Sequence, residues 1–321
     1  MRRREFIALM GGAAAWPLVA QAQQVAKIKR VGFLRVGRPP DAWLEGLRQG
    51  LRELGYLEGR DIAIEFGLPT SATMVAEAVT ELVRLNVDVI FASGVPSLLP
   101  ASNGAGSIPV VFVAAIDPVA IGLVASLARP GGNLTGVSSM QGDIAAKRLE
   151  LVRELFPNLS RIALLVRATS QANAQYVKET EAAARTLGLQ LQVLSLRDAS
   201  DLEGIFSASK GASVLFIADD AVFTTHRIQI AELALKSRLA TVSGIRETVD
   251  AGGLMSYGPD YKELYRRAAT HVHKILQGTK PADLSIEQPV KFELVLNMRT
   301  AKALGITVPP IFHARVDEVI D

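Results

Sequence analysis

The sequence predicts an α/β protein made of two similar lobes, each with a parallel β-sheet covered by helices. After Lys29, short runs rich in β-branched residues alternate with longer stretches of helical period, as in parallel wound sheets. This pattern stops at the turn-forming run from Arg129 to Asn133 and then starts again. Of the 321 residues, 49% are apolar, which is enough for two cores. These three observations together indicate two lobes of the same construction.

The first lobe is predicted to contain four strands with helices between them. A helix beginning at Asp41 and ending at Gly55 is indicated by leucines that recur on one stripe, namely Leu44, Leu47, Leu51 and Leu54. Ser71 is expected to cap a second helix that runs to about Leu85. The strands are expected at residues 30–36, 61–66, 87–92 and 108–114.

The second lobe is predicted to repeat this order after a helix that carries Leu149 and Val152 on its apolar side. A long helix is expected at residues 171–187, and another carries Ile228 and Leu235. The strands are expected at residues 161–166, 189–194, 213–217 and 292–296.

Two short extended segments are interpreted as crossings between the lobes. The first, residues 135–138, follows the turn-forming run, and the second, Gly252 to Pro259, is bracketed by glycines and a proline. A helix from about Asp260 to Leu276 follows the second crossing. We therefore predict one lobe from residues 27–138 plus 253–285 and the other from residues 139–252 plus 286–321.

Residues 1–22 have the composition of an export signal. Three arginines precede an apolar run, and the small residues Ala20 and Ala22 on either side of Gln21 predict cleavage after Ala22. The apolar run is shorter than the roughly 20 residues that span a bilayer. The order Arg3-Arg4-Glu5-Phe6 resembles a twin-arginine signal, although Arg2 stands where Ser or Thr is usual. The alternative is an ordinary secretory signal with a basic start.

The chain has no cysteine, which excludes disulfides, thiolate metal sites and a cysteine nucleophile. It also excludes lipid attachment through an N-terminal cysteine, and we therefore expect the periplasm of a Gram-negative bacterium. Residues 1–22 hold three Arg and one Glu, so 32 basic and 31 acidic side chains remain in the mature chain, a formal charge of +1. A nearly neutral chain argues against a nucleic-acid partner.

Catalytic and cofactor motifs are missing from the sequence. It contains no Gly-x-Ser-x-Gly elbow, no phosphate loop and no His-Glu-x-x-His. The glycines at 104 and 106 lead into Ile108 and Pro109 rather than into a helix, so they do not form a dinucleotide loop. His271 shares a helical stripe with apolar residues and is expected to be a partly buried, hydrogen-bonded side chain. We expect no enzyme activity, no cofactor and no metal.

Polar residues follow the predicted strands, at the edge where wound α/β sheets bind ligands. The candidates for ligand binding are Arg35, Ser93, Gly94 and Asp117 in the first lobe, Arg167 and Asp219 in the second, and Tyr257 near the second crossing. An aspartate suits an ammonium group, and helix N-termini suit a carboxylate. The combination favours a zwitterionic or acidic metabolite.

Each candidate also has a structural interpretation that involves no ligand. Asp117, Asp219 and its neighbour Asp220 could cap the helices that follow them. Ser93 and Gly94 could form only a tight turn, and the two arginines could be solvated or could bridge the lobes. Tyr257 could pack against the hinge.

The sequence resembles the ABC-transporter substrate-binding proteins related to the tryptophan and tyrosine binders. The segments that carry the resemblance lie at residues 46–59, 108–118, 122–137, 252–259, 291–297 and 300–305. They extend across essentially all of the mature chain. The resemblance implies a type I periplasmic binding fold, in which two Rossmann-like lobes with parallel sheets are joined by a three-crossing hinge.

By this resemblance, the partners are a small-molecule solute and an ABC permease in the inner membrane, and the protein is a monomer without catalytic activity. Ser93, Gly94 and Asp117 would line the cleft from the first lobe, Asp219 from the second, and Tyr257 from the hinge side. Arg35 and Arg38 depart from the family, because relatives more often have small hydroxylic residues in this stretch.

Residues 241–243 also depart, because many relatives have an aromatic residue there, before the pair matched by Arg246 and Glu247. Both departures argue against an aromatic amino acid as ligand and favour a more anionic solute. The same lobe closure could instead serve a periplasmic sensor that feeds a membrane receptor or kinase, and the sequence leaves this alternative open.

Overall fold

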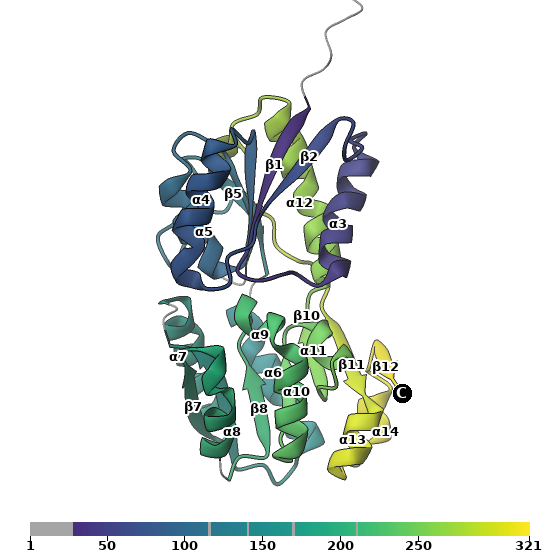
Figure 1. The fold of residues 1–321 in the computed structure, drawn as a ribbon. Helices are drawn as coiled ribbons and strands as arrows, with labels where there is room; N and C mark the ends of the chain where they lie inside the picture. The colour runs from purple at the N-terminus through teal and green to yellow at the C-terminus, as the bar shows by residue number, and fades with distance from the viewer. Residues whose placement is uncertain (1–27, 115–116, 140, 169–170, 210) are drawn as a thin grey trace, which may run out of the picture.

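The computed structural model describes residues 28–114, 117–139, 141–168, 171–209 and 211–321. They form two lobes stacked end to end (Figure 1). The predicted export signal lies outside the described residues. None of the helices in the described ranges is both long enough and apolar enough to span a membrane.

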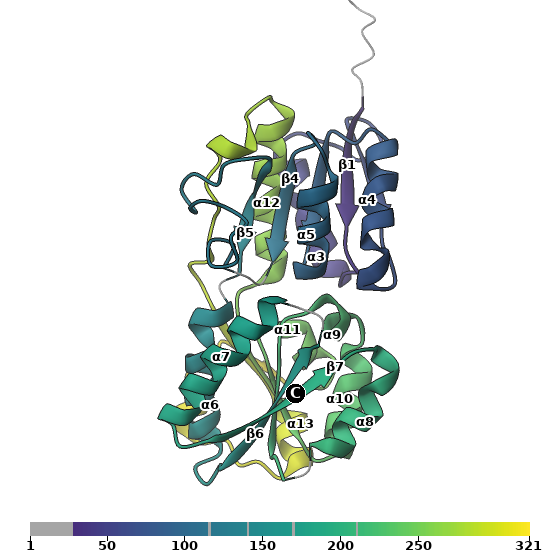
Figure 2. The same cartoon turned by 90° about the vertical axis from the view of Figure 1, so that its left-hand side faces the viewer.

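The first lobe has a five-stranded sheet of order β2-β1-β3-β4-β5 among the described residues, and all of its strand pairs are parallel. The strands are β1 (Lys29–Leu34), β2 (Ile62–Gly67), β3 (Val89–Ser93), β4 (Val110–Ala114) and β5 (Leu134–Ser138). The helices are α3 (Asp41–Glu53), η1 (Ala72–Met74), α4 (Val75–Arg84), α5 (Val95–Gly104), α12 (Tyr261–Leu276) and η3 (Pro281–Asp283). Helices α3 and α12 lie on one side of the sheet and α4 and α5 on the other (Figures 1 and 2).

The second lobe has a seven-stranded sheet of order β12-β11-β10-β9-β8-β6-β7. Its strands are β6 (Arg161–Arg167), β7 (Gln190–Leu196), β8 (Val214–Ile217), β9 (Ala240–Ser243), β10 (Met255–Gly258), β11 (Glu293–Asn297) and β12 (Glu318–Ile320). Its helices are α6 (Gln141–Leu155), α7 (Gln171–Thr186), η2 (Ala199–Asp201), α8 (Leu202–Ala208), α9 (Ala221–Thr225), α10 (Arg227–Lys236), α11 (Arg246–Asp250), α13 (Met298–Leu304) and α14 (Pro310–His313).

The two sheets repeat one topology. The order β7-β6-β8-β9-β10 in the second lobe matches β2-β1-β3-β4-β5 in the first. Two of the described strands depart from the common direction of the second sheet: β11 runs antiparallel to β10, and β12 pairs parallel with β11. The predicted fold class, two α/β lobes with parallel sheets, is therefore confirmed.

The close packing of α3 on α12 fixes one wall of the first lobe. Three leucines of the predicted stripe, Leu44, Leu47 and Leu51, are buried on α3, whereas Leu54 follows the helix and is half-buried. Two glycines let the helix backbones approach: a Cβ at Gly46 would lie 2.2 Å from the carbonyl oxygen of Lys262, and one at Gly50 would lie 2.4 Å from that of Arg266. No larger residue fits at either position without moving α12.

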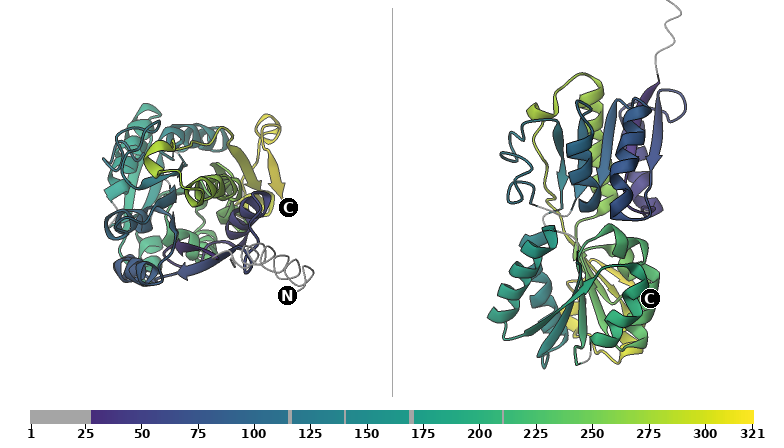
Figure 3. Two further views of the ribbon diagram at one scale, coloured as in Figure 1. Left: turned by 90° about the horizontal axis from the view of Figure 1, so that it is seen from above. Right: turned by 60° about the vertical axis from the view of Figure 1, so that its left-hand side comes forward.

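The chain passes between the lobes after β5, after β10 and after η3, and the three passages lie close together (Figure 3). The second passage corrects our prediction. Residues 253–258 were expected in the first lobe, yet β10 pairs with β9 and β11 in the second sheet. The flanking glycines serve close packing rather than a hinge, because a Cβ at Gly258 would lie 1.9 Å from the carbonyl oxygen of Gly244.

The third passage also lies later than predicted, although by only a few residues. The backbone N–H of Ile286 donates to Leu127 O (2.7 Å), and that of Glu287 donates to Gly136 O (2.9 Å). Residues 286 and 287, predicted in the second lobe, therefore pair with the first.

Candidate functional site

The ends of the central strands in both lobes border one small cavity between the lobes. In a wound sheet, ligands bind where the strand order reverses, which is between β1 and β3 in the first lobe and between β6 and β8 in the second. Arg35 follows β1, Ser93 ends β3, and Asp219 and Asp220 follow β8. The cavity has a volume of about 30 Å³ and is lined by Arg35, Trp43, Ser93, Gly94, Val95, Val113, Asp219, Asp220, Ala221, Thr224, Ile245 and Tyr261.

Arg35 places a buried guanidinium in this cavity, with 1% of its surface exposed. Its Nη1 donates to the carbonyl oxygens of Val36 (3.0 Å) and Arg38 (3.1 Å), so the loop after β1 holds its own arginine. The guanidinium carbon lies 5.6 Å from the centroid of the Trp43 ring, within the range of a cation–π contact. Burial lowers the pKa of Arg35, and Asp220 is among the groups that oppose this shift.

The aromatic side chains of α3 and α12 connect the two lobes. Trp43 and Tyr261 stack with ring centroids 4.5 Å apart and planes inclined by 16°. The indole N–H of Trp43 donates to Glu247 Oε1 of the second lobe (2.5 Å). The hydroxyl of Tyr261 donates to Asp219 Oδ2 (3.1 Å) and lies 3.1 Å from Ser139 Oγ. Both contacts exist only when the lobes are together.

The second lobe supplies two adjacent carboxyl groups, of which Asp220 is buried and Asp219 is half-buried. Burial raises the pKa of both Asp219 and Asp220. The positive charge of Arg148 opposes the shift at Asp219. Asp220 caps α9, because its Oδ1 accepts from Val222 N (2.8 Å). The cap interpretation therefore holds for Asp220, whereas the carboxylate of Asp219 meets a hydroxyl from the other lobe.

Arg148, on α6, lies within the second lobe and interacts electrostatically with Asp219. It is fully buried; its Nε donates to the carbonyl oxygen of Tyr257 (2.7 Å), and its Nη1 lies 3.3 Å from the hydroxyl of Tyr176. The guanidinium thus joins α6 to β10 at the hinge side of the cavity.

Apolar contacts show that the lobes touch closely. Ile245 of the second lobe packs in the same apolar cluster as Trp43 and Leu47 of the first. Ala221 and Val222 pack in the other apolar cluster of the first lobe. The cavity is what remains of the cleft after this closure.

Four of the predicted site residues line the cavity, namely Arg35, Ser93, Gly94 and Asp219. The hydroxyl of Ser93 is hydrogen-bonded to that of Tyr265. Gly94 has φ +80°, and a Cβ there would lie 3.6 Å from the Cβ of Ala221. A glycine is favoured at this position by its backbone conformation, whereas 3.6 Å is an ordinary contact distance that would admit a Cβ.

Three predicted site residues do not line the cavity. Asp117 is exposed, and its Oδ1 accepts from the backbone N–H groups of Val119 (2.9 Å) and Ala120 (3.0 Å), so it holds a turn and does not cap a helix. Arg167 ends β6 and is close enough to Asp220 to oppose the rise in its pKa. The ring of Tyr257 packs against Phe292, with centroids 6.0 Å apart.

Sequence reasoning missed Trp43, Tyr261 and Glu247. Trp43 adjoins the leucine stripe of α3 and was not distinguished from it. Tyr261 is the first residue of a predicted helix that returns to the first lobe, and such a position adjoins the hinge. The position of Tyr261 was thus an available signal, whereas nothing in the sequence places Glu247 against Trp43.

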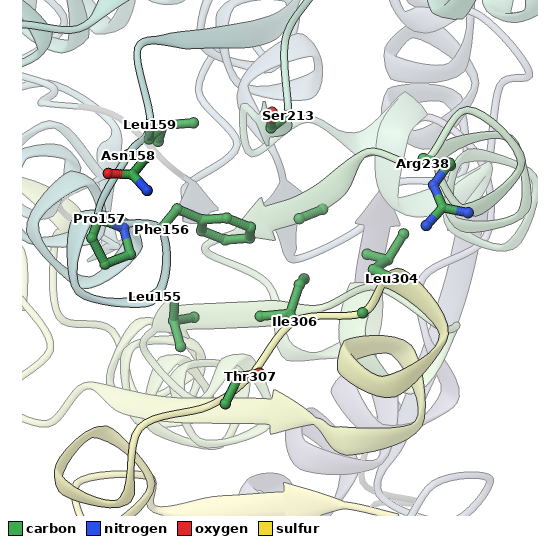
Figure 4. Close-up of a pocket in the computed structure, with 12 residues that line it drawn as sticks. Leu155, Phe156, Pro157, Asn158, Leu159, Ser213, Arg238, Leu304, Ile306 and Thr307 are labelled. Carbon is green, nitrogen blue, oxygen red and sulfur yellow. The ribbon is translucent and has the colours of Figure 1, made fainter.

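A second, larger hollow of about 540 Å³ lies in the second lobe, away from the cleft. It is bordered by Ser213, just before β8, and by Ala240 at the start of β9, which are the opposite ends of these strands. Apolar side chains such as Phe156 and Ile306 surround it, with Arg238 at its edge (Figure 4). No cluster of potential metal ligands occurs among residues that the structure describes.

The repeated wound lobes and the cavity at their facing switch points define the class of type I periplasmic binding proteins. Residues 38–320 match the family model described as ABC transporter substrate binding protein. The chain belongs to this family.

Similar proteins are named for aromatic amino acids. The chain is 27% identical over 289 residues to the tyrosine-binding protein of Clostridioides difficile strain R20291, covering 87% of this chain and 82% of that protein. It is similar to the structure of an ABC domain in complex with L-Trp from Streptococcus pneumonia (25% identity, TM-score 0.83, 92% of this chain and 100% of that chain). It is also similar to a conserved domain protein from Vibrio cholerae (25% identity, TM-score 0.85, 91% and 100%).

Proposed function

We propose that the mature chain is the solute-binding component of an ABC-type importer and closes its lobes around an amino acid or a related small carboxylate. The observation that carries the proposal is the cavity between the lobes, to which each lobe contributes polar side chains from its own switch point. The tyrosine-binding and L-Trp-bound relatives support an amino-acid ligand.

The charges that face the cavity suit a zwitterion. Asp219 and Asp220 are carboxyl groups whose ionised forms are disfavoured by burial, and a ligand ammonium would stabilise them. Arg35 is a buried hydrogen-bond donor, and a ligand carboxylate would accept from it. A ligand with both groups would touch both lobes.

Such a ligand acts by shifting the population of protein molecules from the open to the closed arrangement of the lobes. A cavity of about 30 Å³ has room for only about two water molecules, so an amino acid enters when the lobes are apart. Closure then adds the Trp43–Glu247 and Tyr261–Asp219 contacts to those of the ligand. The closed, loaded form would dock on the permease, and separation of the lobes would release the solute.

We place this activity in the periplasm of a Gram-negative bacterium, with a monomeric chain and an inner-membrane permease as its partner. The export signal predicted at residues 1–22 supports this location. A sensor would use the same closure, and uptake distinguishes the two roles. Deletion of the gene should abolish uptake of the cognate solute if the protein serves an importer, and should leave uptake unchanged if it serves a sensor.

The ligand is identified by a thermal-shift screen of amino acids and small carboxylates, with recovery of the bound solute by mass spectrometry. A solute at 100 times its Kd stabilises the folded state by about 2.7 kcal/mol. For a chain with lobes of this size, that corresponds to a rise in Tm of roughly 5–10 °C. The proposal is contradicted if no such solute raises the Tm, or if the recovered solute has been chemically altered.

A further inference from the structure

One buried N–H group of a residue that lines the cavity has no hydrogen-bond partner among the described residues. Arg35 is 1% exposed and lines the cavity, and its Nε has no hydrogen-bond partner among the described residues. A buried donor without an acceptor is unfavourable, and native proteins keep one only where something else satisfies it. A ligand atom in the cavity is such an acceptor.

The position of this donor is fixed by the protein itself. Nη1 of the same guanidinium is held by the carbonyl oxygens of Val36 and Arg38, both in the loop after β1. Asp220 of the other lobe is close enough to interact with its charge. The guanidinium is therefore not free to leave the cavity, and a carboxylate is the acceptor that suits its remaining donor best.

The same arginine covers Trp43, an aromatic residue that lines the cavity and is only 3% exposed. Tyr261 is stacked on the Trp43 ring at 4.5 Å, and the Arg35 guanidinium lies over that ring at 5.6 Å. A ligand ring would have to displace one of these two side chains to stack on Trp43. Tyr261 is also held by Asp219, and Arg35 by its loop.

Building on the proposed function, we propose that Arg35 makes the site selective for compact, non-aromatic α-amino acids, whose carboxylate accepts a hydrogen bond from Arg35 Nε. The ammonium group of such a ligand lies toward Asp219 and Asp220, so one small zwitterion joins the switch points of both lobes. Selectivity thus comes from a side chain that covers Trp43 and supplies the carboxylate donor at the same time.

The first test uses the wild-type mature chain and the L-amino acids, measured by thermal shift and then by calorimetry. We expect the tightest ligand to be non-aromatic, such as alanine, serine or aspartate. Its α-carboxamide should bind about 10- to 100-fold more weakly, because the amide oxygen accepts the hydrogen bond without the negative charge that strengthens it. Equal binding of the acid and the amide would overturn the role of Arg35.

A matched pair of variants tests the arginine itself. Arg35→Ser should abolish binding of the small amino acid and make stabilisation by L-tryptophan larger than in the wild type. Arg38→Ser is the control: its side chain is exposed and paired with Asp41, so binding should be unchanged. If circular dichroism shows that Arg35→Ser does not fold, the comparison of acid and amide on the wild type still tests whether Arg35 binds the carboxylate.

The outcomes separate this inference from the proposed function. If tryptophan or tyrosine is the tightest wild-type ligand, the inference about Arg35 is wrong, but the proposed function as an amino-acid-binding protein still stands. If no amino acid or carboxylate stabilises the wild type, both are wrong.

Discussion

Removal of the Tyr261 hydroxyl should weaken ligand binding without unfolding either lobe. In Tyr261→Phe the ring remains available to stack on Trp43, while the hydrogen bond to Asp219 across the lobes is lost. A hydrogen bond to a charged group contributes about 1.5–3 kcal/mol. Because this bond requires closed lobes, its loss reduces the closed population, and the Kd should rise about 10- to 100-fold.

Isothermal titration of the cognate solute measures this change. The matched control is Tyr56→Phe, which removes a hydroxyl that lies 3.1 Å from His273 Nδ1, entirely within the first lobe. This control should lower stability slightly and leave the Kd unchanged. The reasoning is refuted if Tyr261→Phe and Tyr56→Phe bind the solute equally well.

Three further predictions concern stability and pH. Burial raises the pKa of Glu247 from 4.5 to about 7, so the folded protein holds a proton that the unfolded chain releases. The free energy of unfolding should therefore fall as the pH rises from about 4.5 to about 7, and Glu247→Gln should remove this part of the decline in urea titrations. Gly46→Ala should lower the free energy of unfolding by roughly 1–3 kcal/mol, because the new Cβ would meet the carbonyl oxygen of Lys262. The control Gly204→Ala, whose Cβ would meet nothing within 4 Å, should leave this free energy unchanged or raise it by up to about 1 kcal/mol in the same titrations. Asp117→Ala should lower the free energy of unfolding by about 1 kcal/mol, because the hydrogen bonds to the backbone of Val119 and Ala120 are lost, and should leave the Kd unchanged; a higher Kd would return Asp117 to the binding site.

The positions of Arg35, Ser93 and Asp219 were predictable because a parallel wound sheet brings its strand ends to one edge. Alternation of apolar runs identifies the strands, and the residue after each run then falls at that edge. The same rule selected Asp117 and Arg167 as well. It does not determine how far each loop extends from the sheet, and Asp117 lies on a loop where its carboxylate accepts from the backbone instead.

The remaining parts of the site depend on contacts between distant segments. Trp43 and Glu247 are 204 positions apart, and only closure of the lobes brings them together. The placement of β10 was wrong because flanking glycines fit both an open hinge and a closely packed strand. The close approach of Gly258 to Gly244 shows that the segment is a packed strand, and the sequence around Gly258 alone does not reveal this approach.

Small-angle X-ray scattering of the mature chain, with and without the solute found by thermal shift, tests the central claim most directly. With saturating solute, the profile should match the one calculated from the closed arrangement described here. Without solute, the radius of gyration should be larger. Identical profiles in the two conditions would contradict binding by closure of the two lobes.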